Sequence, residues 1–284
     1  MEKIIYYFSG TGNSLRTARI IGEEIGGARL VSMAGGPEAV SGAEADVIGF
    51  VCPVYEWDVP KKVKAFIREL AVNPRAYIFM AATYIFIHGR CFETVQSLLS
   101  EKGATLHYAK ALRCVASQCI AYEPFPPAKL MVPLMERGAR KIGKEIALGK
   151  RRPIPAMSPL TRLLHPKMMG PFLAVQSEYD RGFYVSDECV GCQICRKVCP
   201  CGNITFSGNR PVWNHGCEGC NACVAYCPTK AIQFRTPEAY VKLNNLVTRR
   251  LGLPPKRTRY HHPGITAQDL MRREESSSAA GRAQ

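Results

Sequence analysis

Residues 3–14 read Lys-Ile-Ile-Tyr-Tyr-Phe-Ser-Gly-Thr-Gly-Asn-Ser, and this stretch decides the fold of the first half of the chain. Its first six residues are rich in β-branched and aromatic side chains, which predicts a buried strand. Gly10 and Gly12 then interrupt the run, and a helix is expected to follow to about Ile25. A strand, a turn and a helix in this order are typical of an α/β domain.

The same alternation continues downstream. Apolar runs typical of strands lie at 47–51, 77–83 and about 105–115, and helical patterns separate them at about 60–70 and 92–102. A last helix is expected at about 130–148, with Met135, Ala139, Ile142 and Ile146 on one face. Strands that alternate with helices predict an α/β fold with a doubly wound parallel sheet over residues 1–150.

The rest of the chain divides into three segments by composition. Residues 151–182 form a proline-rich linker, whose prolines are expected to fragment any long helix and whose apolar side chains are expected to pack on a domain. Residues 183–236 form a small cysteine-rich α+β domain. Residues 237–284 form a basic C-terminal tail, and its last ten residues are expected to be disordered.

Composition limits the class of protein. No apolar run reaches the ~18 residues of a transmembrane helix, and the N-terminus lacks the features of a signal peptide, so a cytoplasmic protein is expected. The net charge of +15 is spread along the chain instead of forming a nucleic-acid-binding stripe, which favours an acidic external protein as partner over an anionic membrane or nucleic acid. The sequence does not determine the oligomeric state.

Nine of the 13 cysteines lie between Cys189 and Cys227, and eight of these form two copies of one pattern. The first copy is Cys189-x2-Cys192-x2-Cys195-x3-Cys199-Pro200, and the second is Cys217-x2-Cys220-x2-Cys223-x3-Cys227-Pro228. This spacing is typical of two [4Fe–4S] clusters, in which the fourth cysteine of each copy binds the other cluster. One cluster is therefore assigned Cys189, Cys192, Cys195 and Cys227, and the other Cys217, Cys220, Cys223 and Cys199.

Structural zinc and disulfides are the alternatives to clusters. Zinc ribbons separate two cysteine pairs by about 15–20 residues, whereas four cysteines here lie within eleven, and disulfides do not suit a reducing compartment. Cys201 is interpreted as a small buried residue outside the site.

The loop Ser9-Gly10-Thr11-Gly12-Asn13-Ser14 is the second candidate site. It joins a strand to a helix N-terminus, where unpaired N–H groups and the helix dipole favour a phosphate. A P-loop lysine is absent, and Leu15 occupies the place of the third dinucleotide glycine, so the hydroxyls favour a mononucleotide such as FMN. An ordinary helix cap is the alternative.

Two further loops are expected at the same edge of the sheet. Tyr55 and Trp57 lie in the segment 52–60, and they are either walls for a flat ring or hydrophobic plugs. The third loop, 83–89, has Tyr84 near its start.

These motifs together resemble a known arrangement. The segment 3–15 is similar to the FMN-phosphate loop of flavodoxins, and the duplicated cysteine unit resembles bacterial dicluster ferredoxins. Their order resembles the flavodoxin–ferredoxin fusion proteins of anaerobes, called ferrodoxins, as do Pro53-Val54-Tyr55 and the tail motif Arg259-Tyr260-His261-His262-Pro263. The resemblance implies phosphate contacts at Ser9, Thr11, Gly12, Asn13 and Ser14, and flavin-ring neighbours at Tyr55, Trp57 and Tyr84. The bulky third loop departs from the family pattern.

Three functions remain open. The first is electron transfer, in which single electrons pass between two [4Fe–4S] clusters and FMN, and on to an external partner. The second is a flavin-dependent reductase of a small substrate, with His88 as proton donor. The third is a non-redox interaction protein whose first domain lacks flavin. Paired His261 and His262 are interpreted as solvent-facing or partner-binding, without a metal.

Overall fold

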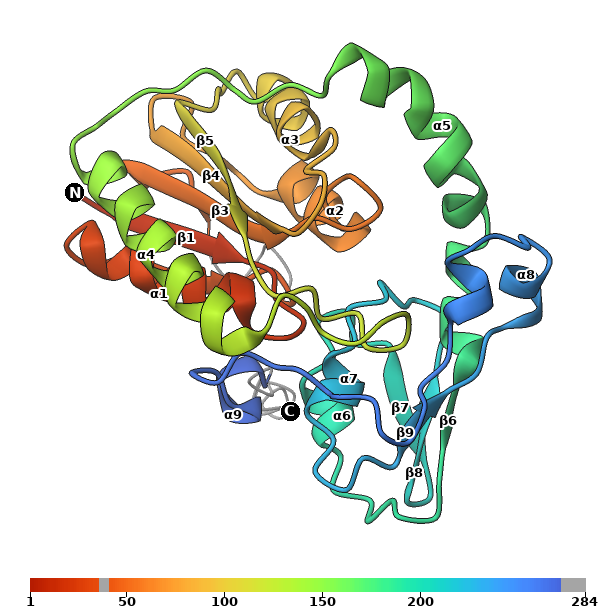
Figure 1. Cartoon of the computed structure of the whole chain (residues 1–284). Coiled ribbons are helices and arrows are strands. Elements are labelled where there is room, and N and C mark those ends of the chain that lie inside the picture. The colour runs from red at the N-terminus through yellow and green to blue at the C-terminus, as the bar shows by residue number, and fades with distance from the viewer. Residues whose placement is uncertain (36–40, 272–284) are drawn as a thin grey trace, which may run out of the picture.

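A five-stranded parallel sheet forms the first part of the computed structural model, which describes residues 1–35 and 41–271 (Figure 1). Its strands are β1 (Lys3–Tyr7), β2 (Arg29–Ser32), β3 (Val47–Pro53), β4 (Tyr77–Tyr84) and β5 (Tyr108–Arg113). They lie in the order β2-β1-β3-β4-β5, with every neighbouring pair parallel. This is the flavodoxin-like order of a doubly wound sheet, and the predicted fold class is confirmed.

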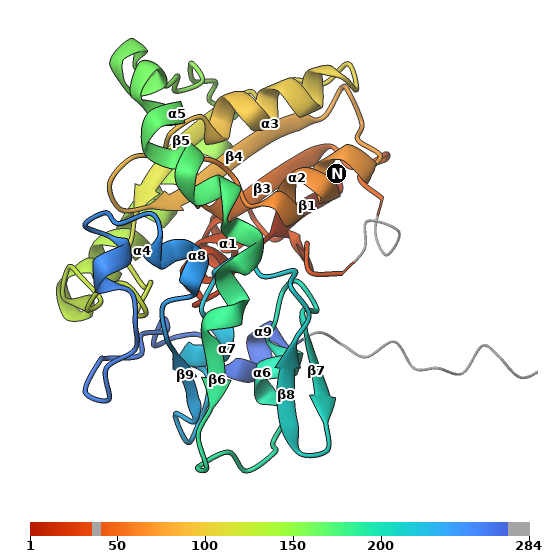
Figure 2. The ribbon, with the colours of Figure 1, turned by 90° about the vertical axis from the view of Figure 1, so that its right-hand side faces the viewer.

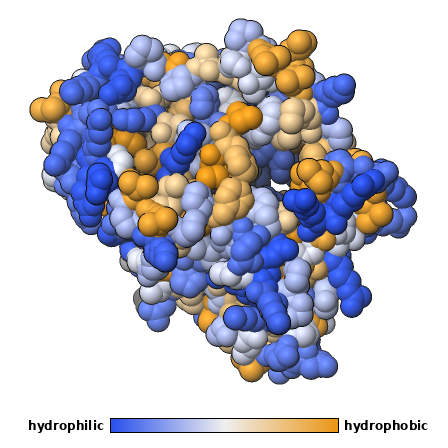
Figure 3. Space-filling view, in the orientation of Figure 1, coloured by the Kyte–Doolittle hydropathy of each residue, from blue (hydrophilic) through white to orange (hydrophobic). Residues whose placement is uncertain are grey.

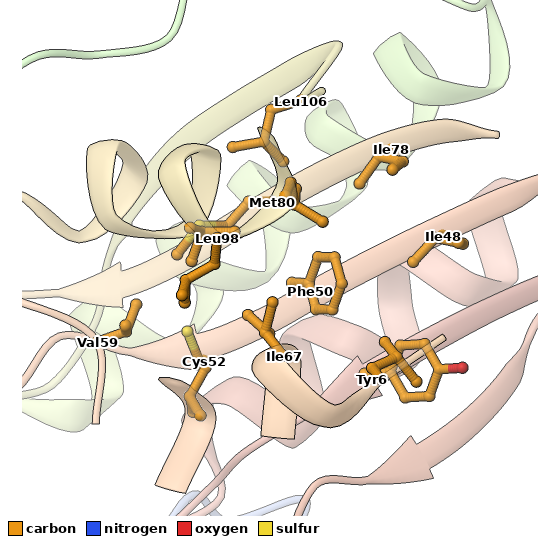
Figure 4. Packing of buried hydrophobic residues seen from close by; sticks show 14 of the residues in the cluster. Tyr6, Ile48, Phe50, Cys52, Val59, Ile67, Ile78, Met80, Leu98 and Leu106 are labelled. Atoms are coloured by element: carbon orange, nitrogen blue, oxygen red, sulfur yellow. The ribbon is translucent and has the colours of Figure 1, made fainter. Parts of the chain in front are cut away.

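Helices cover both faces of this sheet. Helices α1 (Asn13–Glu24) and α4 (Ala128–Ala147) lie on one face, and α2 (Lys61–Glu69) and α3 (Cys91–Ser100) lie on the other (Figure 1). Successive strand residues point to opposite faces, so Phe50 and Met80 pack with Ile67 of α2 under one layer (Figure 4). Phe79 packs with Ile142 of α4 under the other. Both faces are buried, as a parallel sheet requires.

The edge strand β2 was not predicted from the sequence. It has only four residues, Arg29-Leu30-Val31-Ser32, and none of them is fully buried. Such a short segment carries too little hydrophobic periodicity to be recognised. Pairing with β1 along its length, with Ile5 opposite Leu30, holds it in the sheet.

The cysteine-rich part consists of two interleaved repeats beside the large sheet (Figure 2). The first repeat contains β6 (Phe183–Val185), α6 (Ile194–Lys197) and β7 (Ile204–Ser207), and the second contains β8 (Arg210–Trp213), α7 (Ala222–Ala225) and β9 (Ile232–Phe234). Strand β6 pairs with β9 and β7 pairs with β8, both antiparallel. Each two-stranded sheet therefore takes one strand from each repeat.

The expectation that prolines fragment the segment 151–182 is wrong. Helix α5 spans Pro159–Ala174 without a break, although Pro166 and Pro171 lie inside it. Ser158 caps its N-terminus, and Pro159 occupies the first turn, where proline is tolerated. The helix has no fully buried residue, so water can reach the carbonyl groups that lack an N–H partner.

The apolar side chains of α5 pack less than expected. Leu160 and Leu163 are 66% and 77% exposed, and hydrophobic side chains are visible over this helix at the upper right of Figure 3. Only its C-terminal end joins a core, where Phe172 contacts Tyr240. The 3-10 helix η2 (Gln176–Gly182) continues from there into β6.

The C-terminal segment returns to the large sheet after α8 (Glu238–Val241) and the 3-10 helix η3 (Thr248–Arg250), and it ends in α9 (Ala267–Leu270). The last ten residues, for which disorder was predicted, lie outside the described residues. Among the helices that the structure describes, none is both long and apolar enough to cross a lipid bilayer.

Candidate functional site

One cavity of about 320 Å³ lies at the carboxyl ends of the central strands. Four segments of the first part line it: the loop after β1, the loop after β3, the loop after β4, and residues 114–118 after β5. The ferredoxin-like part contributes Glu218, Gly219, Cys220 and Asn221. Its size is that of a small-molecule or cofactor site, and its position is the usual ligand site of an open α/β sheet.

Seven of the eight predicted cofactor residues line this cavity. They are Ser9, Thr11, Asn13, Ser14, Tyr55, Trp57 and Tyr84. Gly12 is the exception, because it lies behind the loop with a φ of 94°, and a Cβ there would be 2.9 Å from the Cβ of Ile265. Glycine is therefore needed at this position for its left-handed backbone and for the close approach of the C-terminal segment.

The loop 9–14 is organised to bind an anion. Ser9 Oγ accepts a hydrogen bond from Leu15 N–H, Thr11 Oγ1 shares one with Ser117 Oγ, and Ser14 Oγ shares one with Thr83 Oγ1. In contrast, the backbone N–H groups of residues 10–14 donate no hydrogen bond to any described residue. Free N–H groups at the start of α1 are what a phosphate requires, so the loop fits the phosphate of FMN.

The lining of the cavity supplies no cationic side chain. Among the described residues that line it, none is Lys, Arg or His, and two are acidic, Glu56 and Glu218. A phosphate in this loop would therefore be held by backbone N–H groups and hydroxyls.

The side chain of Asn13 links the phosphate loop to two other segments of the chain. Its Nδ2 donates to Val115 O at 3.1 Å, and its Oδ1 accepts from Tyr260 Oη at 2.8 Å, with both bonds buried. Two residues further along the same C-terminal segment, His262 N–H donates to Thr11 O at 2.8 Å. The segment 257–271 thus supports the phosphate loop from behind.

The interpretation of His262 as solvent-facing or partner-binding is wrong, because this side chain is 1% exposed. Burial lowers its pKa from 6.5 to about 4, although Glu136 acts in the opposite direction and Arg16 in the same one. Its Nδ1 accepts a hydrogen bond from Gly264 N–H. His261 stacks on Tyr226 with the ring centroids 4.7 Å apart, so this histidine pair joins the two parts of the chain.

The loop after β3 forms a tight turn in which Tyr55 pairs with Asp58. Glu56 and Trp57, between them, both have positive φ, at 47° and 62°. Two consecutive non-glycine residues in this conformation store strain, which is typical of ligand-binding segments. The turn brings both predicted aromatic side chains to the cavity, which Tyr84 and Phe86 of the third loop also line.

Several cavity residues were not identified from the sequence. They include Glu56, Ser117, Gln118, Gln176 and Asn221. Two acceptor atoms among them, Gln176 Oε1 and Asn221 Oδ1, are buried and have no hydrogen-bond partner. No motif marks these residues, because they come from loops that meet only in the folded chain. His88 does not line the cavity and bonds to Gly89 O instead.

The eight repeated cysteines fall into two groups in space. The first group lines one small cavity between the repeats, and its members are Cys189, Cys192, Cys195 and Cys227. Burial and the other three thiols of this group raise the pKa of Cys195 to about 12. The second group consists of Cys199, Cys217, Cys220 and Cys223. Burial raises the pKa of Cys223 well above its usual value, and so do the other three thiols of this second group and, last in size, Cys195 of the first group.

Each group therefore contains three cysteines of one repeat and the fourth cysteine of the other. The left-handed Gly191 and Gly219, with φ of 66° and 68°, turn the chain at equivalent places in the two repeats. A [4Fe–4S] cube binds each thiolate at a different corner, so the sulfur atoms need not converge on one point. In keeping with this, no three His, Cys, Asp or Glu side chains among the described residues lie close enough together to bind a single metal ion. The donor set and its grouping fit two such clusters.

The second cysteine group touches the loop 9–14 directly. A Cβ on Gly10 would lie 2.5 Å from Cys220 O and 2.8 Å from Cys220 Cβ, so the two backbones are in contact. Beside it, the Glu218 carboxylate accepts hydrogen bonds from the N–H groups of Lys61 and Lys62, at 3.1 and 2.7 Å. These N–H groups begin α2, where a carboxylate is favoured. The candidate cluster site and the candidate flavin site are therefore neighbours.

Similar known proteins were found for both parts of the chain. Residues 211–233 match the family of 4Fe-4S binding domains, and this range is the second cysteine repeat. A flavodoxin from the domain Archaea superimposes with 18% identity and a TM-score of 0.38, covering 52% of this chain and 98% of its own. The two-electron reduced flavodoxin of Megasphaera elsdenii gives 21% identity and a TM-score of 0.35, covering 50% and 98%.

No curated protein sequence matches the chain. The fold assignment rests on the strand order of the large sheet. With a flavodoxin-like first half and a 4Fe-4S binding domain near the C-terminus, the chain is consistent with a flavodoxin–ferredoxin fusion.

Proposed function

We propose that this protein is an electron carrier that relays single electrons between two [4Fe–4S] clusters and an FMN, and on to an external redox partner. The observation that carries this proposal is the shared cavity, which is lined both by the loop 9–14 and by Cys220. In this proposal residues 1–150 form the FMN domain, and residues 183–236 form the ferredoxin domain.

The two cysteine groups have different surroundings, which suggests an order for the relay. In the first group Cys192 is exposed, and the neighbouring Val190 is 69% exposed. In the second group Cys220 faces the cavity of the first domain. The first cluster would then exchange electrons with the partner, and the second with the flavin. A cluster carries one electron at a time whereas a flavin holds one or two, so the pair converts between the two kinds of chemistry.

The charge of the chain favours an acidic protein as the external partner. The net charge is +15, and positive surfaces steer acidic proteins toward them. The reductase alternative has less support, since His88 does not line the cavity.

The relay is tested by anaerobic rapid mixing of the full-length protein with less than one equivalent of a strong reductant. Cluster and flavin absorbance are followed separately. We expect the clusters to be reduced first and the flavin afterwards, at a rate that does not change with protein concentration. A flavin phase whose rate rises in proportion to protein concentration would mean transfer between molecules, and it would contradict an internal relay.

A further inference from the structure

The two cysteine repeats carry different polar residues at the position after their second cysteine. Gln193 follows Cys192 in the first repeat, and Asn221 follows Cys220 in the second. Both residues precede a short helix, and both have a left-handed backbone, with φ of 61° and 57°. Gln193 lies near the surface, and its Oε1 accepts a hydrogen bond from Arg196. Asn221 is only 3% exposed, so the side chain at this backbone position is buried in the second repeat and partly solvent-accessible in the first.

One buried acceptor atom of the Asn221 side chain has no hydrogen-bond donor. Its Oδ1 is fully buried and accepts no hydrogen bond from any described residue. Leaving a buried acceptor unpaired costs about 1–3 kcal/mol, so such atoms usually mark a ligand or a missing donor. Asn221 lines the cavity of about 320 Å³ at the carboxyl ends of the strands, and the missing donor is therefore expected from whatever fills that cavity.

The surroundings of Asn221 are rigid enough to position it. On one side the Cys220 backbone is pressed against Gly10, and on the other Glu218 is bound to the start of α2. The cavity that Asn221 borders is also lined by Tyr55 and Tyr84, the predicted ring neighbours. An oxidised flavin ring carries one N–H group, at N3, and a reduced ring carries more, so it can supply the donor that Oδ1 lacks.

We propose that Asn221 is a flavin-binding residue: its side-chain oxygen accepts a hydrogen bond from an N–H group of the isoalloxazine ring. This inference rests on the proposed function, because it requires FMN in the cavity. It adds that the ferredoxin domain completes the flavin site, because Asn221 directly follows the proposed cluster ligand Cys220. Gln193, at the same place in the other repeat, has no such role.

The test uses the full-length protein, purified anaerobically, and two matched variants, Asn221→Gly and Gln193→Gly. Glycine adopts the left-handed backbone freely, so each variant removes a side chain without straining the turn. FMN affinity is measured by titrating flavin-free protein, and iron and sulfide are counted in parallel. We expect Asn221→Gly to raise the Kd for FMN about tenfold, which is about 1.4 kcal/mol. Gln193→Gly is expected to leave it unchanged.

A second variant covers the case in which Asn221→Gly loses iron. Asn221→Asp keeps the size, the left-handed preference and an acceptor oxygen, and adds a negative charge beside the ring. It is expected to bind FMN but to shift the flavin midpoint potential to more negative values. The inference is overturned if both Asn221 variants match Gln193→Gly in Kd and in flavin potential. Failure of the wild-type protein to bind FMN would instead contradict the proposed function.

Discussion

Replacing Gly10 by alanine tests the contact between the two candidate cofactor sites. The new Cβ would lie 2.5 Å from Cys220 O and 2.8 Å from Cys220 Cβ. Favourable contacts of carbon atoms lie at about 3.5–4.0 Å, so the overlap is about 1 Å, and the nearest atom belongs to rigid backbone. The φ of Gly10 is not in the left-handed region, so the substitution acts through this overlap alone.

The overlap forces the loop 9–14 and the Cys220 loop apart. Overpacking of this kind costs about 1–3 kcal/mol. We expect the free energy of unfolding to fall by about that amount, and the Kd for FMN to rise. Internal transfer from cluster to flavin should slow as well, because the two sites separate. Anaerobic urea denaturation, FMN titration and rapid mixing measure the three effects.

Gly22→Ala is the matched control. It lies in the last turn of α1, away from the loop 9–14, and its Cβ would meet neighbours at 3.7 Å, an ordinary contact distance. Alanine has a higher helix propensity than glycine, so this variant should be at least as stable as the wild type. Equal stability, FMN affinity and transfer rate in Gly10→Ala and Gly22→Ala would refute the close contact.

Three further predictions concern the C-terminal segment and the cysteine groups. Tyr260→Phe removes the buried hydrogen bond to Asn13 Oδ1 and should lower the free energy of unfolding by about 1–3 kcal/mol in urea denaturation. Burial lowers the pKa of His262 from 6.5 to about 4, so its stabilising contribution is fully present above pH 6.5 and is lost as the pH falls toward 4. The free energy of unfolding should therefore decrease between pH 7.5 and 5.5 more in the wild type than in His262→Gln, as measured by urea denaturation, and equal decreases would show that His262 is not responsible. Cys227→Ala should remove the EPR signal of the cluster whose other ligands lie in the first repeat, and Cys199→Ala that of the other, whereas loss within the same repeat would contradict the exchanged ligand sets.

The features that could be predicted from the sequence are those encoded in short, regular patterns. The apolar run at 3–8 and the glycines after it predict the first strand and turn. Met135 and Ile142 are buried, as their helical spacing predicts. Within the cysteine-rich part, the 28-residue repeat predicts equivalent turns, which Gly191 and Gly219 form. Patterns of this kind depend on residues that are close in sequence, so they can be recognised in a single amino-acid sequence.

The features that could not be predicted depend on contacts between distant segments. The edge strand β2 exists because β1 pairs with it, and α5 keeps its helix despite Pro166 because it is solvated. His262 is buried because the C-terminal segment folds back onto Thr11, more than 240 residues earlier. Asn221 reaches the cavity only because the two domains meet at Cys220. Neither composition nor spacing contains that information.

The proposed relay requires two clusters and one flavin in a single chain. Quantifying iron, acid-labile sulfide and FMN in the full-length protein after anaerobic purification and reconstitution tests it most directly. The proposed assignment of eight cysteines to two clusters, with FMN in the shared cavity, predicts about eight irons, about eight sulfides and about one FMN per chain. Four irons, or zinc in place of iron, would contradict the two clusters, and absence of flavin after reconstitution would contradict the relay.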